Sequence, residues 1–477
     1  MRPRLAWVAI AQHNLHSTSR CKADEAPRFR TTPHTERTME PHSPPSAQLL
    51  TPAGSAPALS LAVIGAGPAG LSLALQASLA LPGARVTVFD ARSAEHDVAR
   101  DARTLALSLG TVQELSRLGV WGPIARSGAQ ADIREVHVSQ QQPTVLWPGP
   151  QQPEVCISAQ EQGVAQLGAV VGYGTLVAPL QQAWLEATAR EPQRLAMRFG
   201  TPVRGFKPLD TGVEVDADIA ERFDLVVVAE GGVFADQAKL QWPQGLSRDY
   251  EQTAWVGQVR LEDGPADGVA YERFTPSGPA ALLPLPRGAV SPAGESGRRA
   301  ALVWCVQRHD DPVAELNDAQ RLVLLNTIFH PRVGRIVEVS PLKAFPLGLN
   351  AHSRLVSDEV VVRIGNAAQT LHPVAGQGFN LAMRDVHELL GALKEQAWAG
   401  EDDADTRQMK VQRALRQFER RRQPDRWALM AATDFLARSF TWPAPILATA
   451  RGLGLGAVQQ LGPVKRLLAR SMMFGWR

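Results

Sequence analysis

The chain has 477 residues, of which 44% are hydrophobic and 20% are charged, a composition typical of a globular protein with a sizeable core in one or two domains. No apolar run approaches the length of about eighteen residues that a spanning helix needs, and the three scattered cysteines form no CxxC pair that would indicate a zinc site or a disulfide framework. The net charge is +3, yet residues 59–434 carry 37 basic and 43 acidic residues. The body therefore has no basic excess, and we expect no nucleic-acid partner.

The first 58 residues are rich in Pro, Ser, Thr, Arg and His, lack hydrophobic periodicity and are predicted to be disordered. A short apolar run at 5–11 resembles an export signal, but the polar residues that follow it interrupt the apolar core. We therefore expect a cytoplasmic protein. Every recognisable motif follows Met39, which makes Met39 an alternative translation start.

Order is predicted to begin with a nucleotide-binding unit. A buried strand at 59–64 precedes a glycine-rich turn, a helix at 71–81 and a second strand at 85–90. The turn has the G-x-G-x-x-G pattern and contains Gly65, Gly67, Pro68, Ala69 and Gly70. This complete strand, turn, helix and strand unit predicts dinucleotide binding far more specifically than the glycine pattern alone.

Each part of this unit has a physical role. Gly65 permits the tight turn, Gly67 lets a pyrophosphate approach the backbone, and Gly70 lets the helix pack closely on the strand. Asp90, at the end of the second strand, can accept hydrogen bonds from ribose hydroxyls. No second unit of this kind follows. Gly452–Gly456 lacks a preceding strand and is interpreted as a flexible joint between helices.

Two further segments lie between this unit and the middle of the chain. Arg103, which precedes a helix predicted at 111–118, is either a surface charge at a helix start or a clamp on the phosphates or ribityl chain of a cofactor. The apolar run 223–228 predicts another buried parallel strand, which ends at Glu230. Alternating patterns with Gly/Pro turns over 246–350 predict an antiparallel sheet.

A second glycine-rich loop follows the apolar strand 360–364 and leads into a helix at 376–395. Such a loop exposes N–H groups at a helix N-terminus, where an anionic or electron-rich ligand is favoured. Gly376 and Gly378 would let the main chain approach a flat ring without a Cβ in the way. An ordinary strand-to-helix loop is the alternative interpretation.

The last predicted element is a basic amphipathic helix that begins at Pro463. Residues 435–477 carry six basic and no acidic residues. Arginines together with Phe474 and Trp476 could give reversible docking on a membrane surface, although docking on another protein or packing on the body of the chain are alternatives.

Taken together, these motifs resemble those of the single-component FAD-dependent aromatic hydroxylases with the para-hydroxybenzoate hydroxylase fold, and most closely their ubiquinone-biosynthesis branch. The resemblance covers residues from about 59 to the C-terminus. Its most specific part is the run 365–385, and it also includes 65–70, 101–108, 271–279, 302–305 and 421–426. The chain departs from the family at Ala102, Glu230 and Asn366, and Ala382 replaces a common glycine.

This resemblance implies an α/β fold: a Rossmann-like FAD-binding domain with an interleaved antiparallel-sheet substrate domain and a C-terminal helical tail. The implied FAD-binding domain comprises 59–131, 170–245 and 355–398, the substrate domain comprises 132–169 and 246–354, and helices occupy 399–477. Beyond the glycine-rich turn, Asp90 and Arg103, the implied cofactor contacts are Glu230, Gly365, Asn366, Gly376, Gln377, Gly378, Phe379 and Asn380. The candidate pocket wall is Phe274, Leu283 and Pro284, which ordinary core packing would equally explain.

The implied activity is a monooxygenase reaction in which NAD(P)H reduces FAD and a flavin hydroperoxide delivers one oxygen atom of O2 to the ring of a prenylated phenol of the 2-polyprenyl-6-methoxyphenol type. His372 and Pro373 would lie beside the flavin ring. His372 would either assist deprotonation of the phenol or simply order its loop. No metal is expected. The alternative is a non-catalytic flavin-binding assembly subunit of a quinone-synthesis complex. The implied location is cytoplasmic, or peripheral on the inner face of the membrane through residues 435–477.

Overall fold

The computed structural model describes residues 57–145, 147, 152–231, 245–264, 267–286, 298–442 and 445–475, which belong to one compact unit, Ser55–Arg477. The predictions for the N-terminal extension and for Trp476 lie outside the described residues. Within the described part of the chain, no helix is long and apolar enough to cross a membrane.

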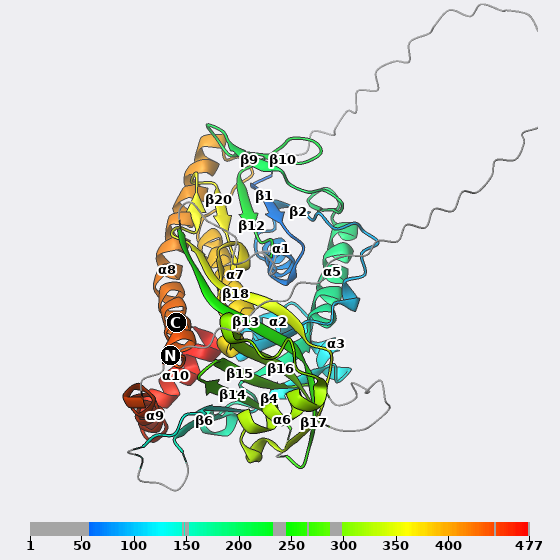
Figure 1. Cartoon of the computed structure of the whole chain (residues 1–477). Coiled ribbons are helices and arrows are strands. Elements are labelled where there is room, and N and C mark those ends of the chain that lie inside the picture. Colours follow the sequence, from blue (N-terminus) through cyan, green and yellow to red (C-terminus); the bar gives the residue numbers. More distant parts are fainter. Residues whose placement is uncertain are drawn as a thin grey trace, which may run out of the picture. The chain divides into compact units, whose positions relative to one another are not determined.

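A six-stranded sheet contains the predicted nucleotide-binding unit (Figure 1). Its order is β19 (Val356–Ser357), β20 (Val361–Arg363), β12 (Leu225–Val228), β1 (Leu59–Ile64), β2 (Ala84–Phe89) and β8 (Leu195–Arg198). All neighbours are parallel except β19 and β20. The central strands β1 and β12 are nearly continuous apolar runs, interrupted only by Ser60, because parallel strands of this kind are covered on both faces. The strands predicted at 59–64, 85–90, 223–228 and 360–364 are thus confirmed within one or two residues.

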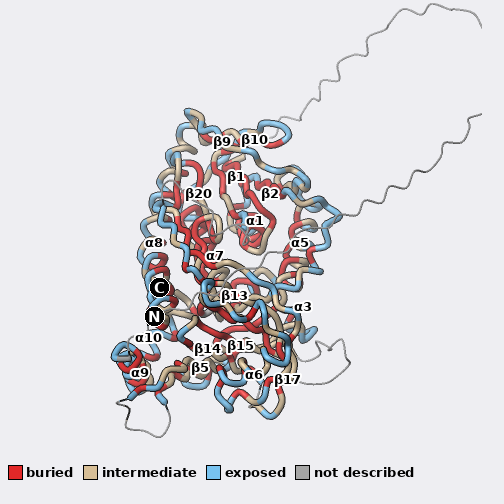
Figure 2. The backbone as a smooth tube through the Cα atoms, viewed as in Figure 1, coloured by how far each residue is buried: buried red, intermediate tan, exposed pale blue. Residues whose placement is uncertain are grey.

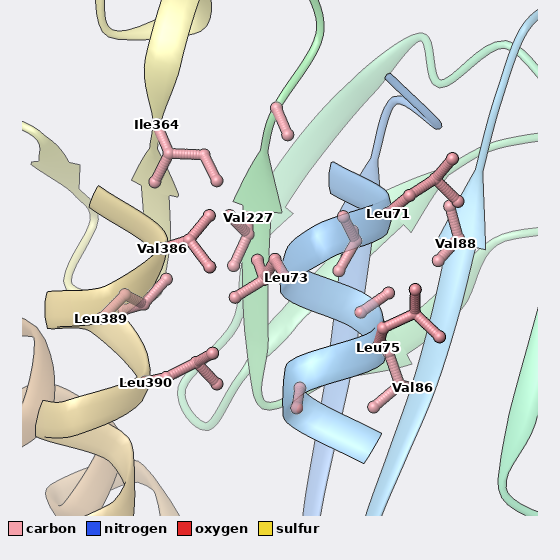
Figure 3. Close-up of a cluster of buried hydrophobic side chains, with 14 of the residues drawn as sticks. Leu71, Leu73, Leu75, Val86, Val88, Val227, Ile364, Val386, Leu389 and Leu390 are labelled. Carbon is pink, nitrogen blue, oxygen red and sulfur yellow. The ribbon is translucent and has the colours of Figure 1, made fainter. Parts of the chain in front are cut away.

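Two helices pack their apolar side chains against this sheet (Figure 3). Helix α1 (Pro68–Ala80) places Leu71, Leu73 and Leu75 against the strands, and α7 (Gln377–Lys394) contributes Val386, Leu389 and Leu390. Helix α1 begins at Pro68, three residues before the predicted start, because proline suits the first helical turn, where its missing N–H would have no partner. Helix α5 (Tyr173–Arg190) joins the same core.

The antiparallel sheet predicted over 246–350 is confirmed and is larger than expected. Its order is β21 (Gln369–Thr370), β18 (Lys343–His352), β13 (Gly245–Glu262), β16 (Arg298–Gln307), β15 (Gly278–Pro284), β14 (Val269–Thr275), β5 (Glu135–Gln140) and β6 (Glu154–Ser158), and β17 (Arg335–Val339) also pairs with β13. Only the β14–β5 pair in this sheet is parallel among the described strands. Helix α6 (Asp318–Ile328) packs its buried side chains onto this sheet.

Two small sheets and three short helices accompany the two larger sheets in the described part of the chain. One three-stranded sheet is formed by β3 (Thr104–Ser108), β7 (Gly168–Gly172) and β4 (Gln130–Ile133), and another by β9 (Gly205–Pro208), β10 (Val213–Asp216) and β11 (Glu221–Phe223). Three short helices are α2 (Leu109–Arg117), which confirms the helix predicted at 111–118, α3 (Trp121–Arg126) and α4 (Ala159–Gln162). Arg103 precedes a strand, so the alternative that placed it as a surface charge at a helix start is wrong about the element.

The C-terminal region consists of α8 (Ala404–Ser439), α9 (Pro445–Gln460) and α10 (Gly462–Phe474). The prediction of a flexible joint at Gly452–Gly456 is wrong, because these residues lie inside α9. A Cβ on Gly452 would lie 1.8 Å from the Thr144 hydroxyl oxygen, and one on Gly456 would lie 2.5 Å from the Trp147 ring. These two glycines therefore serve close packing. Buried residues recur every four positions, at 448, 452 and 456 in α9 and at 465, 469 and 473 in α10, with exposed residues between them, so each helix is buried on one side; Figure 2 marks buried and exposed residues along the chain.

Candidate functional site

Four predicted site segments leave the parallel sheet at the same edge. Gly65 follows β1, Asp90 follows β2, Glu230 comes two residues after β12, and Gly365 comes two residues after β20. The last residues of β1 and β2, Ile64 and Phe89, are register partners, as are Ile64 and Val228. Because the carboxyl ends of parallel strands form the ligand-binding edge of such sheets, segments about 300 residues apart converge on one site.

The first glycine-rich loop is shaped by three different constraints. Gly65 has φ +102, a conformation that other residues rarely adopt, and a Cβ on Gly70 would lie 2.0 Å from the Gly65 carbonyl oxygen. A Cβ on Gly67, in contrast, would meet only the Tyr173 hydroxyl at 3.6 Å. The protein itself thus leaves space at Gly67. No side chain caps α1, so this space lies beside its open N-terminal N–H groups.

Asp90 holds this loop in place. Its Oδ2 accepts a hydrogen bond from the Ala66 N–H at 2.7 Å, and its two oxygens accept further bonds from the Arg92 guanidinium at 2.9 Å. Burial raises the pKa of the Asp90 carboxyl, but the hydrogen bonds and charge of Arg92 outweigh burial and lower it overall. Sequence reasoning missed Arg92, although its position two residues after the acid was a usable signal.

Arg103 lies beside the same loop. Its guanidinium pairs with Asp101 at 2.7 Å and stacks 4.1 Å from the centre of the Tyr173 ring. The Tyr173 hydroxyl in turn borders the space at Gly67. Sequence reasoning also missed Tyr173, because its separation of 70 residues from Arg103 leaves no local signal.

The second glycine-rich loop has the same combination of strain and open space. Gly365 and Gly376 have φ +57 and +59, and a Cβ on Gly365 would lie 2.8 Å from the Ala382 Cβ. A Cβ on Gly378 would meet only the Asn366 side-chain oxygen, at 4.0 Å. Helix α7 begins at Gln377 and has no side-chain cap, so Gly378 and Phe379 lie in an open helix N-terminus.

Strand β3 connects the two loops. It begins directly after Arg103, and its Ala106 Cβ would lie 3.0 Å from a Cβ on Gly376. Asn380 fixes this contact: its amide donates to the Ala106 carbonyl at 3.0 Å, and its oxygen accepts from the Ser108 N–H at 2.8 Å. The Asn380 side chain therefore helps to build the site by holding β3 against the start of α7.

A buried charge network supports the second loop from behind. Asp385 is fully buried, and its Oδ2 accepts from the Gly365 N–H at 2.9 Å, while its Oδ1 accepts from Arg422 of α8 at 2.8 Å. Arg422 also binds Asp425, and Arg426 donates to Gln369 at 2.6 Å. These positioning residues lie within two segments on which the family resemblance rests, but only packing reveals how they support the loop.

His372 lies within the protein next to the second loop, with 1% of its surface exposed. Its Nε2 is 2.9 Å from the Gln252 side-chain oxygen, and its Nδ1 accepts from the Val374 N–H at 3.3 Å. Burial lowers the pKa of His372 to about 3. The ring is therefore neutral, with Nε2–H donating to Gln252, and it orders the segment that follows Pro373.

The three predicted pocket residues do not share one surface. Phe274 packs with Val374 of the second loop and stacks on Phe440 at 3.9 Å between ring centres. Leu283 packs in a neighbouring cluster on the same side of the sheet, since both clusters include Val138. Pro284 instead lines a cavity with Tyr271 and Leu282. Alternate strand residues point to opposite faces, which separates Pro284 from Leu283.

Among the described residues, one group with the spacing of metal ligands lies on β5 and β6. Glu135, His137 and Cys156 could offer metal ligands. The Glu135 carboxylate lies 2.5 Å from the His137 ring nitrogen and 2.9 Å from the Cys156 sulfur, which are hydrogen-bond distances. Burial of the Cys156 thiol, and in second place its hydrogen bond to Glu135, raise the pKa of this thiol to about 12. In this cluster, His137 and Cys156 thus both form hydrogen bonds with the Glu135 carboxylate.

The described site fits FAD on observations of the protein itself. The two open glycine positions, Gly67 and Gly378, each adjoin an uncapped helix N-terminus, and β3, which follows Arg103, contacts the second loop through Ala106. The Tyr173 hydroxyl borders the first position, and Arg92 and Arg103, each paired with an aspartate, belong to the same group of side chains and can donate hydrogen bonds of the kind that a pyrophosphate accepts. At the second position, no side chain covers the backbone of Gly378, so a flat ring can approach it.

Comparisons with known proteins agree with this geometry. Residues 58–422 match the family model described as FAD binding domain. The ubiquinone hydroxylase UbiL of Rhodospirillum rubrum is 30% identical over 90% of this chain and 93% of its own, and the 3-demethoxyubiquinol 3-hydroxylase of Escherichia coli is 28% identical over 85% and 96%. Among solved structures, p-nitrophenol 4-monooxygenase PnpA from Pseudomonas putida has a TM-score of 0.61 at 15% identity, covering 87% of this chain and 98% of its own.

The family match spans most of the chain, and the similarity to the first of these relatives extends over nearly the full length of both proteins. The predicted family resemblance, fold class and FAD cofactor are thereby confirmed. The chain belongs to the FAD-binding-domain family and, within it, to the FAD-dependent ring hydroxylases of ubiquinone biosynthesis.

Proposed function

We propose that this monooxygenase hydroxylates the aromatic ring of a prenylated phenol of the 2-polyprenyl-6-methoxyphenol type, with NAD(P)H and O2 as co-substrates. The observation that carries the proposal is the pair of open glycine positions, Gly67 and Gly378, each at an uncapped helix N-terminus, which we take as the phosphate site and the ring site of one FAD molecule. The names of the relatives, a ubiquinone hydroxylase and a 3-demethoxyubiquinol 3-hydroxylase, support the substrate class.

Bound FAD supplies the redox and oxygen chemistry, and the protein has to supply position, charge and a dry site. We assign the pyrophosphate to the N-terminus of α1 near Arg103, and the adenosine ribose to Asp90. The backbone N–H groups of 377–380, with Asn366 at the edge, would face the flavin ring. Partial positive charge at the α7 N-terminus would then stabilise negative charge that develops on the ring.

The substrate ring is proposed to lie on the side of the large sheet that carries Phe274. This side chain is 2% exposed and contacts Val374, so it links the sheet to the flavin loop. Phe440 stacks on it, which places the C-terminal end of α8 at the same wall. Pro284 is not part of this proposed wall.

His372 is proposed to position the flavin loop. A histidine whose pKa lies near 3 and whose two ring nitrogens bind Gln252 and Val374 is poorly suited to take a proton from a phenol at neutral pH. Its neutral form holds Val374, which contacts Phe274. Loss of His372 should therefore alter substrate and flavin geometry and leave the pH dependence of ring deprotonation unchanged.

We further propose that the protein works in the cytoplasm, peripherally on the inner face of the membrane, since a polyprenylated substrate partitions into lipid. The basic C-terminal segment 435–477 supports this placement.

A direct experiment measures NAD(P)H oxidation by the purified, FAD-loaded protein with a short-chain prenylphenol and ¹⁸O2. We expect substrate-stimulated NAD(P)H oxidation and a product heavier by one ¹⁸O atom. Gly378→Val, which would cover the proposed ring site, should abolish hydroxylation, whereas Gly454→Val, at an exposed position with no neighbour within 4 Å, should not. Bound flavin that NAD(P)H never reduces would contradict the proposal and favour the non-catalytic assembly subunit.

A further inference from the structure

The outward face of α9 is almost entirely apolar. Ile446, Leu447 and Leu453 are 83%, 37% and 40% exposed. The other exposed positions of α9 whose side chains are described are Ala450, Gly454, Ala457 and Gln460. Gln460 is thus the single polar residue on this described face. A solvent-facing helix surface normally carries charged and polar residues, so an outward apolar face indicates a surface with a binding partner.

Helix α10 continues this surface with apolar and basic residues side by side. Val464, Leu467 and Leu468 are 45%, 68% and 40% exposed, and Leu461 between the two helices is 53% exposed. Arg466 and Arg470 are exposed on the flank of this apolar group, and in the described part of the chain neither forms an ion pair. We call the exposed apolar residues of 446–468, together with Arg466 and Arg470, the tail surface.

The protein holds this surface in a fixed orientation. Gly452 and Gly456 bring α9 close to Thr144 and Trp147, and the Gln459 side-chain oxygen accepts from the Cys156 N–H at 2.9 Å. In α10, the buried side chain of Lys465 donates to Glu161 at 3.0 Å. Gly452, Gly456, Gln459 and Lys465 thus hold the two helices on the protein together with inward apolar residues such as Val458 and Met473, while other large apolar residues of both helices remain exposed.

The exposed apolar residues of the tail surface differ from the residues that the sequence indicated for membrane contact. Phe474, predicted to insert into a membrane, packs in a buried cluster against Gly110, where an added Cβ would lie 3.3 Å from its ring. Of the outward apolar residues of α9, Leu453 lies within Gly452–Gly456, the segment predicted to be a joint, and Ile446 and Leu447 precede it.

We propose that the tail surface docks on the surface of an anionic phospholipid bilayer, with the apolar residues of α9 and α10 at the level of the acyl chains and Arg466 and Arg470 at the phosphates. Charge complementarity favours this occupant, because residues 435–477 contain six basic and no acidic residues. An apolar stripe flanked by arginines is the pattern of an interfacial helix. The inference concerns this surface alone and does not depend on the identity of the substrate.

Vesicle co-sedimentation of the full-length, FAD-loaded protein tests the proposal without substrate or reductant. We expect binding to vesicles of phosphatidylcholine with phosphatidylglycerol, weaker binding to phosphatidylcholine alone, and a decrease with added salt. Ile446→Glu/Leu453→Glu should lower the partition coefficient at least tenfold. Arg466→Gln/Arg470→Gln should remove the preference for anionic lipid.

Val323→Glu is the matched control, because Val323 on α6 is 70% exposed and lies outside the tail surface. It should bind vesicles like the unmodified protein. Unchanged FAD content in every variant shows that the fold is retained. Equal binding by Ile446→Glu/Leu453→Glu and Val323→Glu would overturn the proposal. An oligomer that Ile446→Glu/Leu453→Glu dissociates, with no vesicle binding by the unmodified protein, would also overturn it and assign the tail surface to a second copy.

Discussion

Substituting Gly67 with alanine should weaken FAD binding and leave the fold of the chain intact. Gly67 has φ −74 and ψ 179, which alanine adopts without strain, and its added Cβ would meet only the Tyr173 hydroxyl at an ordinary 3.6 Å. The gain from a stiffer unfolded chain, about 0.4–1 kcal/mol, and the loss at a helix N-cap, also under about 1 kcal/mol, nearly cancel. We therefore expect the melting temperature of the FAD-free protein to stay within a few degrees of the unmodified value.

The methyl group would, however, fill the space that we assign to the pyrophosphate. Losing one hydrogen bond from a backbone N–H to a charged phosphate costs about 1.5–3 kcal/mol, or about 10- to 150-fold in the FAD dissociation constant. Titration of the FAD-free protein with FAD, followed by quenching of flavin fluorescence, measures this constant. Circular dichroism on the same sample measures the melting temperature.

Gly70→Ala is the matched comparison within the same loop. Its Cβ would lie 2.0 Å from the Gly65 carbonyl oxygen, so the backbone has to move and both stability and FAD binding should fall. Our reasoning would be refuted if Gly67→Ala bound FAD as tightly as the unmodified protein. It would also be refuted if both variants lost stability equally, because the space at Gly67 would then serve packing.

Three further outcomes are expected. Asp385→Asn weakens the buried ion pair with Arg422 and the hydrogen bond to the Gly365 N–H, so the free energy of unfolding should fall by about 3 kcal/mol. The midpoint of urea unfolding measures this loss, and an unchanged midpoint would argue against a supporting role. Burial lowers the pKa of His372 from 6.5 in the unfolded chain to about 3 in the folded protein, so the free energy of unfolding should fall as the pH drops below about 6.5, by up to about 1.4 kcal/mol per pH unit. His372→Gln should flatten this slope, which urea titrations at several pH values measure. Asp90→Ala should weaken FAD binding by about 1.5–3 kcal/mol, so the variant should lose FAD on gel filtration. A normal flavin content after gel filtration would count against the ribose assignment.

The sequence by itself determined those features that depend on contiguous residues. The strand, glycine turn and helix from Leu59 to Ala80 could be predicted because apolar periodicity and the need for glycine act over a few residues. The same holds for the loop that leads from Gly365 into α7. Local patterns also indicated the antiparallel sheet, since alternation of side chains identifies a strand without its partners.

Tertiary structure alone decided which distant residues meet. Tyr173 comes to Gly67, and Arg422 comes to Asp385, only because strands and helices from separate parts of the chain pack at one edge of the sheet. The glycines of α9 show the physical reason most clearly. A glycine both weakens an isolated helix and permits close packing, and the sequence does not reveal which effect operates until a neighbour such as Trp147 is in place. Once that neighbour fixes the inner side of α9, the outward direction of Ile446 and Leu453 follows.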